Sequence, residues 1–335
     1  MLGRETANRS AQSHVDIALP IGQCIVMIRN LIRRIALTLP WLWLAACILG
    51  ALIRLSVRDG FPLLSVLFYA TPIPVLAGLA LLSATAWASS KRWIYCTGAL
   101  LIAMGCILWW HRCSHFDNSS YRSRAEDSVM LWNVAHGRLG WDSIVDRIRA
   151  EDPDIIALIE ADPQSVGAAE ISTRLPEYQA STLYQGMQLM AKGNVKDIEQ
   201  GSLAGRGYYR IINVGTDDSD YCAVLVDIHS SPLLSRQPPL EAIESIVSGI
   251  QNQPLLLMGD FNTPSDSVHF DRIRESCDNA FEDAGTGYAV TWPVPLPIMA
   301  LDQIWVNKLV RSVRCELGWT WSSDHRPIIL TIAGK

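Results

Sequence analysis

The stretch Pro254–Pro264 brings two polar side chains to the end of a short apolar run. The apolar run predicts a buried strand, and Gly259 near its end lets the backbone turn sharply. Asp260 and Asn262 follow with one residue between them, so alternation along an extended chain directs both to one side and Phe261 to the core. A carboxylate and a carboxamide held side by side can orient a water molecule and take a proton from it.

Four further stretches carry polar residues at the end of, or inside, apolar strand-like runs. They contain Asn133 in Leu131–Val134, Glu160 in Asp154–Glu160, Asp302 in Leu301–Val306, and Asp324 and His325 in Ser323–Ile328. Any one of these stretches is compatible with an ordinary turn or a solvated strand end, because Gly, Asp, Asn, Ser and Pro are common turn residues. Their occurrence together favours one shared site at the mouth of a sheet.

This ordered set resembles the endonuclease/exonuclease/phosphatase superfamily, the family of exonuclease III, deoxyribonuclease I, inositol polyphosphate phosphatases and bacterial sphingomyelinases. The resemblance covers Ser128 to the C-terminus, and its most specific parts are Gly-Asp-Phe-Asn at 259–262 and Ser-Asp-His at 323–325. It implies an α/β fold, the four-layer αββα sandwich of deoxyribonuclease I, and hydrolysis of phosphoesters.

The resemblance also implies a divalent cation bound by oxygen ligands, Mg²⁺ with Mn²⁺ as the alternative. Glu160, at the end of an otherwise apolar strand, matches the family glutamate that binds Mg²⁺. Asn133 matches the family asparagine beside it and is expected to support the metal or the phosphate. Asp324 matches a residue near the metal.

Four residues match the family positions that act on the substrate. Asp260 and Asn262 match the pair that orients and activates water. His325 matches the histidine that contacts the scissile phosphate, and Asp302 matches the aspartate that orients this histidine. The last pairing is physically sound, because a nearby carboxylate raises the pKa of a histidine and favours its charged form.

A second histidine, His229, follows the predicted strand Tyr221–Ile228 in the sequence Asp-Ile-His-Ser-Ser-Pro. It resembles the His-Ser-x-Pro of deoxyribonuclease I and could protonate the leaving oxygen. The chain between Glu160 and His229 is short for the family, and no acidic partner of His229 can be singled out. The candidates are Glu170, Glu177 and Glu199.

Three functions are compatible with these residues. The first is a membrane-anchored, divalent-metal-dependent phosphoester hydrolase of the phosphodiesterase or nuclease type that uses an activated water. The second is a sphingomyelinase-like or phosphoinositide-phosphatase-like hydrolase of lipid headgroups, and the third is a non-catalytic membrane-tethered scaffold. The complete polar set from Asn133 to His325 argues against the scaffold. The expected partners are a phosphodiester substrate, from nucleic acid or a lipid headgroup, and a lipid bilayer; no protein partner can be inferred.

Charge is distributed unevenly along the chain. Residues 1–127 contain 12 Lys and Arg against 6 Asp and Glu, whereas residues 128–335 contain 16 against 27, a net charge of −11. Proteins that grip long duplex DNA carry basic faces, since Lys and Arg neutralise the phosphates. The acidic C-terminal part therefore predicts generic phosphodiester cleavage, with weak, salt-sensitive and sequence-independent activity on DNA.

Hydrophobic patterning in the C-terminal part predicts alternating strands and helices. The expected strands, besides the one that ends near Asp260, are 129–134, 154–160, 186–191, 208–214, 221–229, 304–306 and 328–332, and the expected helices are 141–150 and 240–250. This alternation agrees with the α/β sandwich that the resemblance implies.

Three charge-free apolar runs, Ala36–Ile53, Phe61–Ala88 and Trp93–Trp110, precede this part. Each approaches or exceeds the roughly 20 residues that cross a bilayer, and tryptophans gather at their ends as in an interfacial belt. Pro72 and Pro74 interrupt the second run, which can kink a membrane helix without preventing a span. The sequence thus predicts about three transmembrane helices.

Four segments follow: an N-terminal tail (1–36), a transmembrane region (37–110), a polar linker (111–127) and a catalytic domain (128–335). A slight excess of basic residues, which includes Arg4 and Arg9, favours a cytoplasmic N-terminus. Three spans then predict a multi-pass membrane protein whose catalytic domain is extracytoplasmic, on the periplasmic side.

Overall fold

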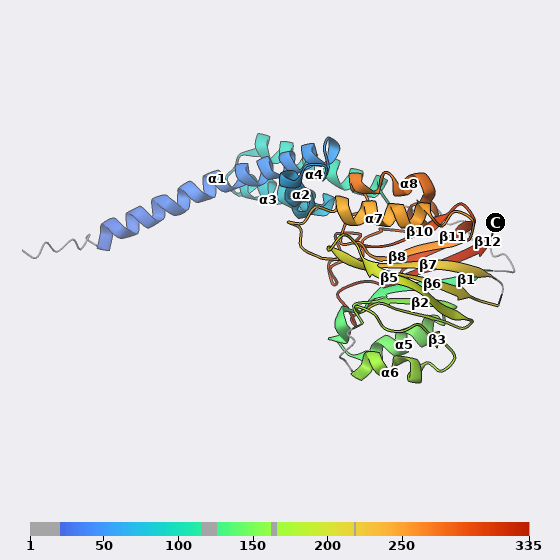
Figure 1. Ribbon diagram of the computed structural model, residues 1–335. Coiled ribbons are helices and arrows are strands. Elements are labelled where there is room, and N and C mark those ends of the chain that lie inside the picture. The colour runs from blue at the N-terminus through green and yellow to red at the C-terminus, as the bar shows by residue number, and fades with distance from the viewer. Residues whose placement is uncertain (1–20, 115–125, 162–165, 218, 335) are drawn as a thin grey trace, which may run out of the picture.

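A computed structural model of the chain describes residues 21–114, 126–161, 166–217 and 219–334, which form a helical region and an α/β domain (Figure 1). Parts of the predicted tail and linker lie outside these residues. The helices are α1 (Ile21–Leu55), α2 (Pro62–Ala70), α3 (Ile73–Ser89), α4 (Trp93–Arg112), α5 (Trp141–Glu151), α6 (Val166–Arg174), α7 (Gln237–Ser248), α8 (Ile273–Ser276) and α9 (Ala280–Ala284), with 3₁₀ turns at Ala135–Gly137 and Val268–Phe270.

Twelve strands among the described residues form two six-stranded sheets. They are β1 (Asp127–Asn133), β2 (Ile155–Ile159), β3 (Gln179–Ala180), β4 (Gln188–Ala191), β5 (Val195–Ser202), β6 (Gly207–Gly215), β7 (Asp220–Ile228), β8 (Leu255–Asp260), β9 (Cys277–Asn279), β10 (Asp302–Asn307), β11 (Val310–Leu317) and β12 (Ile328–Gly334). The strand orders are β11-β12-β1-β2-β4-β3 and β5-β6-β7-β8-β10-β9. Strands β1 and β2 are parallel, and so are β7 and β8.

The two sheets pack face to face, and helices cover their outer faces (Figure 1). In β1, Leu131 belongs to the core between the sheets, whereas Trp132 packs under α5. In β8, Met258 belongs to the core between the sheets and Leu257 packs under α7. Alternation along strands that are buried on both faces explains the nearly continuous apolar runs, and the predicted four-layer αββα sandwich is confirmed.

The hydrophobic pattern missed four strands, and these four are the edges of the two sheets. They are β3, β5, β9 and β11. Edge strands bury less apolar surface and often carry charges that discourage pairing with other chains. Strand β5, with Lys196, Asp197 and Glu199, is largely exposed and illustrates why its pattern is weak.

The helical region differs from the expected three single spans. Only α1 and α4 are, among the described residues, single helices long and apolar enough to cross a membrane. The run Phe61–Ala88 is divided into α2 and α3, which are bent by 67° and together form a broken span or a re-entrant loop. Pro72 precedes α3 as its N-cap, and a proline cannot continue a helix without losing a hydrogen bond. Helix α1 begins at Ile21, inside the segment predicted as a tail.

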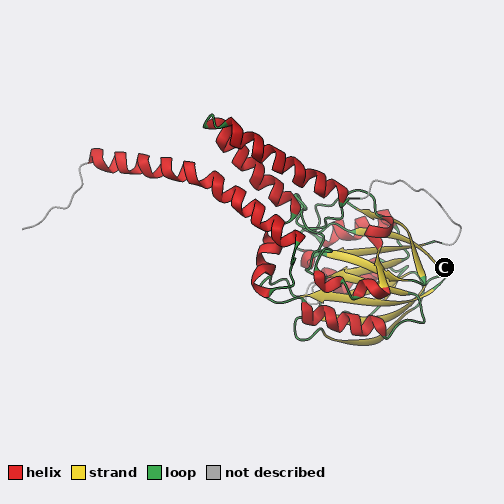
Figure 2. Ribbon diagram, turned by 90° about the horizontal axis from the view of Figure 1, so that it is seen from above, coloured by secondary structure: helices red, strands yellow, loops and turns green. Residues whose placement is uncertain are grey.

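Polar contacts join the end of α1 to the loop after β8. Arg54 forms an ion pair with Asp266, and Arg58 forms one with Asp271 at 3.3 Å. Asp59 is buried and accepts hydrogen bonds from Ser267 Oγ at 2.6 Å and from the Val268 amide at 3.0 Å. The helices therefore extend from one end of the sandwich in a defined direction (Figure 2).

Candidate active site

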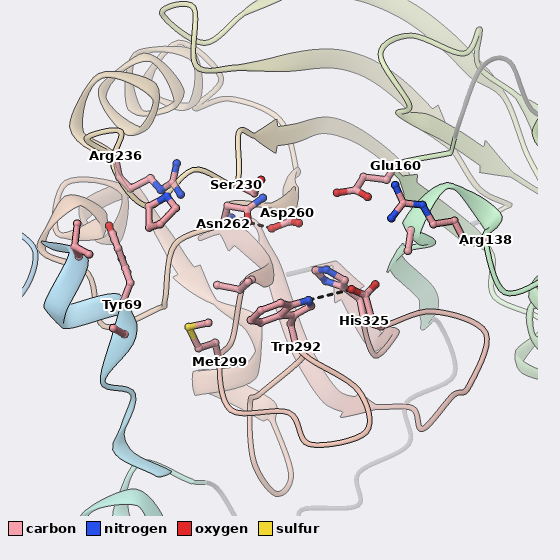
Figure 3. Close-up of a pocket in the computed structure, with 16 residues that line it drawn as sticks. Tyr69, Arg138, Glu160, Ser230, Arg236, Asp260, Asn262, Trp292, Met299 and His325 are labelled. Atoms are coloured by element: carbon pink, nitrogen blue, oxygen red, sulfur yellow. Dashed lines mark hydrogen bonds between the residues drawn. The ribbon is translucent and has the colours of Figure 1, made fainter. Parts of the chain in front are cut away.

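A cavity of about 430 Å³ opens at one end of the sandwich (Figure 3). Its lining comes from the loops at the carboxyl ends of β1, β2, β7 and β8, from the segments that precede β10 and β12, and from α2 of the helical region. The carboxyl ends of parallel neighbours meet at the same sheet edge, so local strand patterns deliver several polar side chains to one place.

Asp260 lies at the centre of this cavity, at the last position of β8. One carboxylate oxygen accepts a hydrogen bond from the Asn262 amide at 2.8 Å, and the other accepts one from Asn133 Nδ2 at 3.0 Å. Burial raises the pKa of Asp260 to about 7; the charge of Asp302 adds to this effect and that of His325 opposes it. A carboxylate with such a pKa is suited to accept a proton near neutral pH.

Asn262 also lines the cavity, but a turn brings it there rather than strand alternation. The strand ends at Asp260, and Asn262 has a φ of 46° in the left-handed region. Its Nδ2 donates to the Ile228 carbonyl at 2.8 Å, which holds the turn against β7. The intervening Phe261 is fully buried under α7, as predicted.

His325 lines the cavity and is paired with Asp302. The Nδ1 atom of His325 lies 2.7 Å from Asp302 Oδ2, and both side chains are buried. Burial lowers the pKa of His325, but the charge and hydrogen bond of Asp302 outweigh burial and raise the pKa to about 10. His325 is thus an imidazolium at neutral pH, which can stabilise negative charge on a phosphoryl group.

Three acidic or amide residues were predicted to hold or support a metal. Glu160, just after β2, and Asp324 both line the cavity. Asn133 is fully buried, and its carboxamide bonds Asp260 and the Ala135 amide. It therefore orients the Asp260 carboxylate directly, and its role beside a metal stays a prediction.

The carboxylates at the cavity fit a hard cation. Asp324 Oδ2 accepts a hydrogen bond from Trp292 Nε1 at 3.1 Å, whereas its buried Oδ1 has no hydrogen-bond partner among the described residues. Buried acceptors are almost always paired, so this oxygen is suited to a ligand that carries positive charge. Glu160 and Asp324 supply the oxygen donors that Mg²⁺ and Mn²⁺ prefer.

A tighter cluster, Asp260, Asp302 and His325, brings its possible ligand atoms within 4.8 Å of one another. A histidine must be unprotonated to bind a metal, whereas the pKa of His325 is raised to about 10. Within this cluster His325 is bonded to Asp302, while Asp260 is bonded to Asn133 and Asn262. The roles of these residues, and of Glu160 and Asp324 as cation ligands, stay predictions.

His229 is not brought into the cavity lining. Strand β7 ends at Ile228, and the His229 ring is exposed and packs edge-on against Tyr208 with ring centroids 6.0 Å apart. Its neighbours Ser230 and Pro232 do line the cavity. The proposed leaving-group role of His229 stays a prediction, and so does the identity of its acidic partner.

Sequence patterns missed several residues of the site. Asp227 on β7 lies opposite Asp260 in the parallel register, and burial, with the charges of Asp260 and Glu160, raises its pKa well above the usual range. The sequence could have pointed to Asp227, because this residue, like Glu160, is a carboxylate near the end of an apolar strand. Tyr69 and Arg236 have no such signal, since a distant helix and a loop bring them together.

Comparisons with known proteins bear on the family and the fold. The sequence model of the Endonuclease/Exonuclease/phosphatase family matches residues 130–325, more than half of the chain. No curated protein matches the chain.

Solved structures share the fold at low sequence identity. D. rerio TDP2, solved with a single-strand DNA product, is 15% identical with a TM-score of 0.51, covering 62% of this chain and 99% of that one. The human Nocturnin catalytic domain is 18% identical with a TM-score of 0.51, covering 63% and 94%. A family protein from Bacteroides thetaiotaomicron is 13% identical with a TM-score of 0.52, covering 64% and 100%. At these identities the likeness establishes the fold.

Proposed function

Because this chain belongs to the endonuclease/exonuclease/phosphatase family, we propose that it is a membrane-anchored, divalent-metal-dependent phosphodiesterase. The observation that carries the proposal is the buried row in which Asn133 bonds Asp260 while Asp302 bonds His325 beside it. This row faces a cavity that Glu160 also lines, with its carboxylate directed toward Asp260 (Figure 3). A base near its working pKa and a fixed cation are what hydrolysis of a phosphodiester requires.

The chain's own residues account for the proton and charge movements. A water molecule held by Asp260 and Asn262 loses a proton to the Asp260 carboxylate as its oxygen forms a bond to phosphorus. The bond between phosphorus and the leaving oxygen breaks, and that oxygen takes a proton from solvent. The His325 imidazolium, fixed by Asp302, stabilises the charge that develops on the phosphoryl oxygens.

Glu160 and Asp324 are the residues that would hold the divalent cation. When bound, the cation neutralises charge on the phosphoryl oxygens and orients the phosphate. The buried Asp260 and the lining residue Asp324 come from the ends of different strands, which supports separate roles for the two carboxylates.

Membrane anchoring is supported by the length and composition of α1 and α4. Most of their large apolar side chains are exposed in the structure, among them Leu49, Leu52, Leu101 and Met104. Exposed apolar surface on this scale is stable in a bilayer and costly in water.

The proposal is tested with the full-length protein in detergent micelles and with bis(p-nitrophenyl) phosphate as substrate. We expect hydrolysis with Mg²⁺ or Mn²⁺, none in EDTA, and recovery when the metal is restored. Asp260→Ala should lower kcat by at least about 100-fold, because it removes the general base. Asp278→Ala, an exposed aspartate on the edge strand β9, is the matched control. Full activity in EDTA, or an active Asp260→Ala protein, would refute the mechanism.

A further inference from the structure

One wall of the catalytic cavity comes from the helical region. Val66, Tyr69 and Ala70 of α2 line the cavity together with residues of the α/β domain. The other side of α2 is apolar and open, with Leu63 90% exposed and Leu67 39% exposed. A short helix with a cavity on one face and exposed leucines on the other is suited to the boundary between a binding pocket and lipid.

Tyr69 meets a buried arginine at this wall. Arg236, which is only 2% exposed, precedes α7, lines the cavity and lies with its guanidinium 5.9 Å from the Tyr69 ring centroid (Figure 3). It donates to the His229 carbonyl at 2.5 Å, while its Nε has no hydrogen-bond partner among the described atoms. No carboxylate of the described residues forms an ion pair with Arg236.

The charges of Asp260 and Asp59 act on Arg236 without an ion pair, and Asp59 already accepts a hydrogen bond from the Tyr69 hydroxyl at 2.8 Å. A buried cation without an ion pair is still costly, and the positive end of the α7 dipole beside it adds to the cost. An anionic ligand bound in the cavity beside Arg236 would offset this cost. Arg236 and Tyr69 lie on the side of the cavity away from Glu160, so an anionic group bound there leaves the predicted cation site free (Figure 3). These two residues form what we call the α2 subsite.

The loops around the cavity mouth also carry exposed apolar side chains. Leu233 is 79% exposed beside the lining residue Pro232, and Leu296 is 74% exposed between the lining residues Trp292 and Met299. Two further side chains share this arrangement, Leu139 beside Arg138 and Trp321 before Asp324. Large apolar side chains on loop tips around one opening mark a surface that meets lipid or another protein.

The candidate membrane helices end against the α/β domain near this opening, at a smaller cavity that shares Met299 with the catalytic one. Arg54 of α1 pairs with Asp266, and Trp110 of α4 stacks on Tyr288 with ring centroids 4.4 Å apart. Both contacts place the domain-side ends of α1 and α4 against the α/β domain. A bilayer around these helices would therefore lie beside α2 and the loop tips, which identifies lipid as the occupant of this surface.

We propose that the catalytic cavity opens onto the bilayer and accepts the anionic headgroup of a phospholipid, with Tyr69 and Arg236 recognising that headgroup. This inference rests on the proposed phosphodiesterase function and names its substrate class. The acyl chains stay in the leaflet while Leu233 and Leu296 enter the interface. The net charge of −11 in residues 128–335 opposes wide binding of a nucleic acid, whereas a cavity of about 430 Å³ suits a single headgroup.

The test uses the full-length protein reconstituted in phosphatidylcholine vesicles that contain phosphatidylglycerol, phosphatidylserine or a phosphatidylinositol phosphate. Release of the water-soluble headgroup is compared with hydrolysis of bis(p-nitrophenyl) phosphate and of a single-stranded DNA oligonucleotide. We expect one of the anionic lipids to be the best substrate. Arg236→Gln should raise the apparent KM for this lipid at least about tenfold, as loss of a charge-assisted contact predicts.

A matched pair of loop variants separates docking from chemistry. Leu233→Ser with Leu296→Ser should lower the ratio of lipid to soluble-diester turnover at least about tenfold, because less apolar surface enters the interface. Leu309→Ser, 40% exposed in the turn between β10 and β11 at the opposite end of β10 from Asp302, should leave this ratio at the wild-type value. Equal ratios in both variants, or faster cleavage of DNA than of any lipid, would overturn the inference.

Spin labels test the surface independently of activity. In a background with Cys24→Ser and Cys113→Ser, a label on Leu296→Cys should be reached by membrane-dissolved oxygen, whereas one on Leu309→Cys should be reached by a water-soluble relaxation agent. If the water-soluble agent reaches both labels, the proposal that these loops enter the membrane is refuted, even when the protein hydrolyses the diester. If the labels differ but no phosphodiester is hydrolysed, the phosphodiesterase proposal fails, and with it the assignment of a lipid substrate.

Discussion

Asp260 and His325 lie in the same candidate site and carry opposite charges when ionised. The pKa values of both side chains are raised, but for different reasons. Burial raises the pKa of Asp260 to about 7, and Asp302 raises that of His325 to about 10 against the effect of burial. Between these values, a carboxylate base and an imidazolium are present together. This is the combination that water activation and phosphoryl charge stabilisation require.

At the residue scale, the pH profile follows from these pKa values. The rate of phosphodiester hydrolysis should rise with pH through about 7, as Asp260 loses its proton, and should fall near 10, as His325 loses its own. Asp302→Asn removes the negative charge that stabilises the imidazolium, so the alkaline limb should move to lower pH. The measurement is kcat/KM against pH for both proteins. An alkaline limb at the same pH in the variant would show that Asp302 does not control His325.

At the element scale, Gly259 decides how closely β8 approaches β7. Its φ is 153°, and a Cβ there would lie 1.9 Å from the Val226 carbonyl oxygen. No other residue type can occupy this position without moving β8, which carries Asp260 at its end. The glycine of the Gly-Asp-Phe-Asn stretch is thus explained by packing of backbone against backbone.

Gly259→Ala should therefore reduce both stability and activity. We expect a loss of about 2–3 kcal/mol in the free energy of unfolding from strain and overpacking, with a lower kcat because Asp260 is displaced. Thermal or denaturant unfolding of the purified protein measures the first effect, and hydrolysis of the soluble diester the second. Gly334→Ala is the control, since a Cβ at Gly334 meets no heavy atom within 4 Å. Equal stability of the two variants would contradict the argument.

At the scale of the whole molecule, the path of the chain bears on membrane orientation. The domain-side ends of α1 and α4 both contact the α/β domain, so α3 must lead away from the domain for α4 to return to it (Figure 2). Helix α3 has 17 residues, and α2 lies bent against it by 67°. If α1 and α4 span the bilayer, the chain crosses three times, with α2 at the interface.

Three crossings would put the start of α1 and the α/β domain on opposite sides of the membrane. With the weak basic bias at the N-terminus, we expect the catalytic domain outside the cytoplasm. A reporter enzyme that folds only outside the cytoplasm should be active when fused after Lys335 and inactive when fused before Met1. Activity of the N-terminal fusion alone would reverse the orientation, and activity of neither or both would contradict three crossings.

Local patterns in the sequence determined the strands and the polar residues at their ends. A two-residue period and an apolar run are properties of a few consecutive residues, so the strand ends at Asp260 and next to Glu160 could be predicted. The sandwich followed from these strands together with the family resemblance. The four edge strands could not be predicted in the same way, because they bury too little apolar surface to show the period.

Only the tertiary structure decided what surrounds these residues. It bonded Asn133 to Asp260, left His229 outside the cavity lining while Ser230 and Pro232 line it, and divided one apolar run into two bent helices. It also brought Tyr69 to Arg236 across 167 positions of sequence. A contact of this kind depends on how separate elements pack, and neither residue carries a local pattern that records its partner.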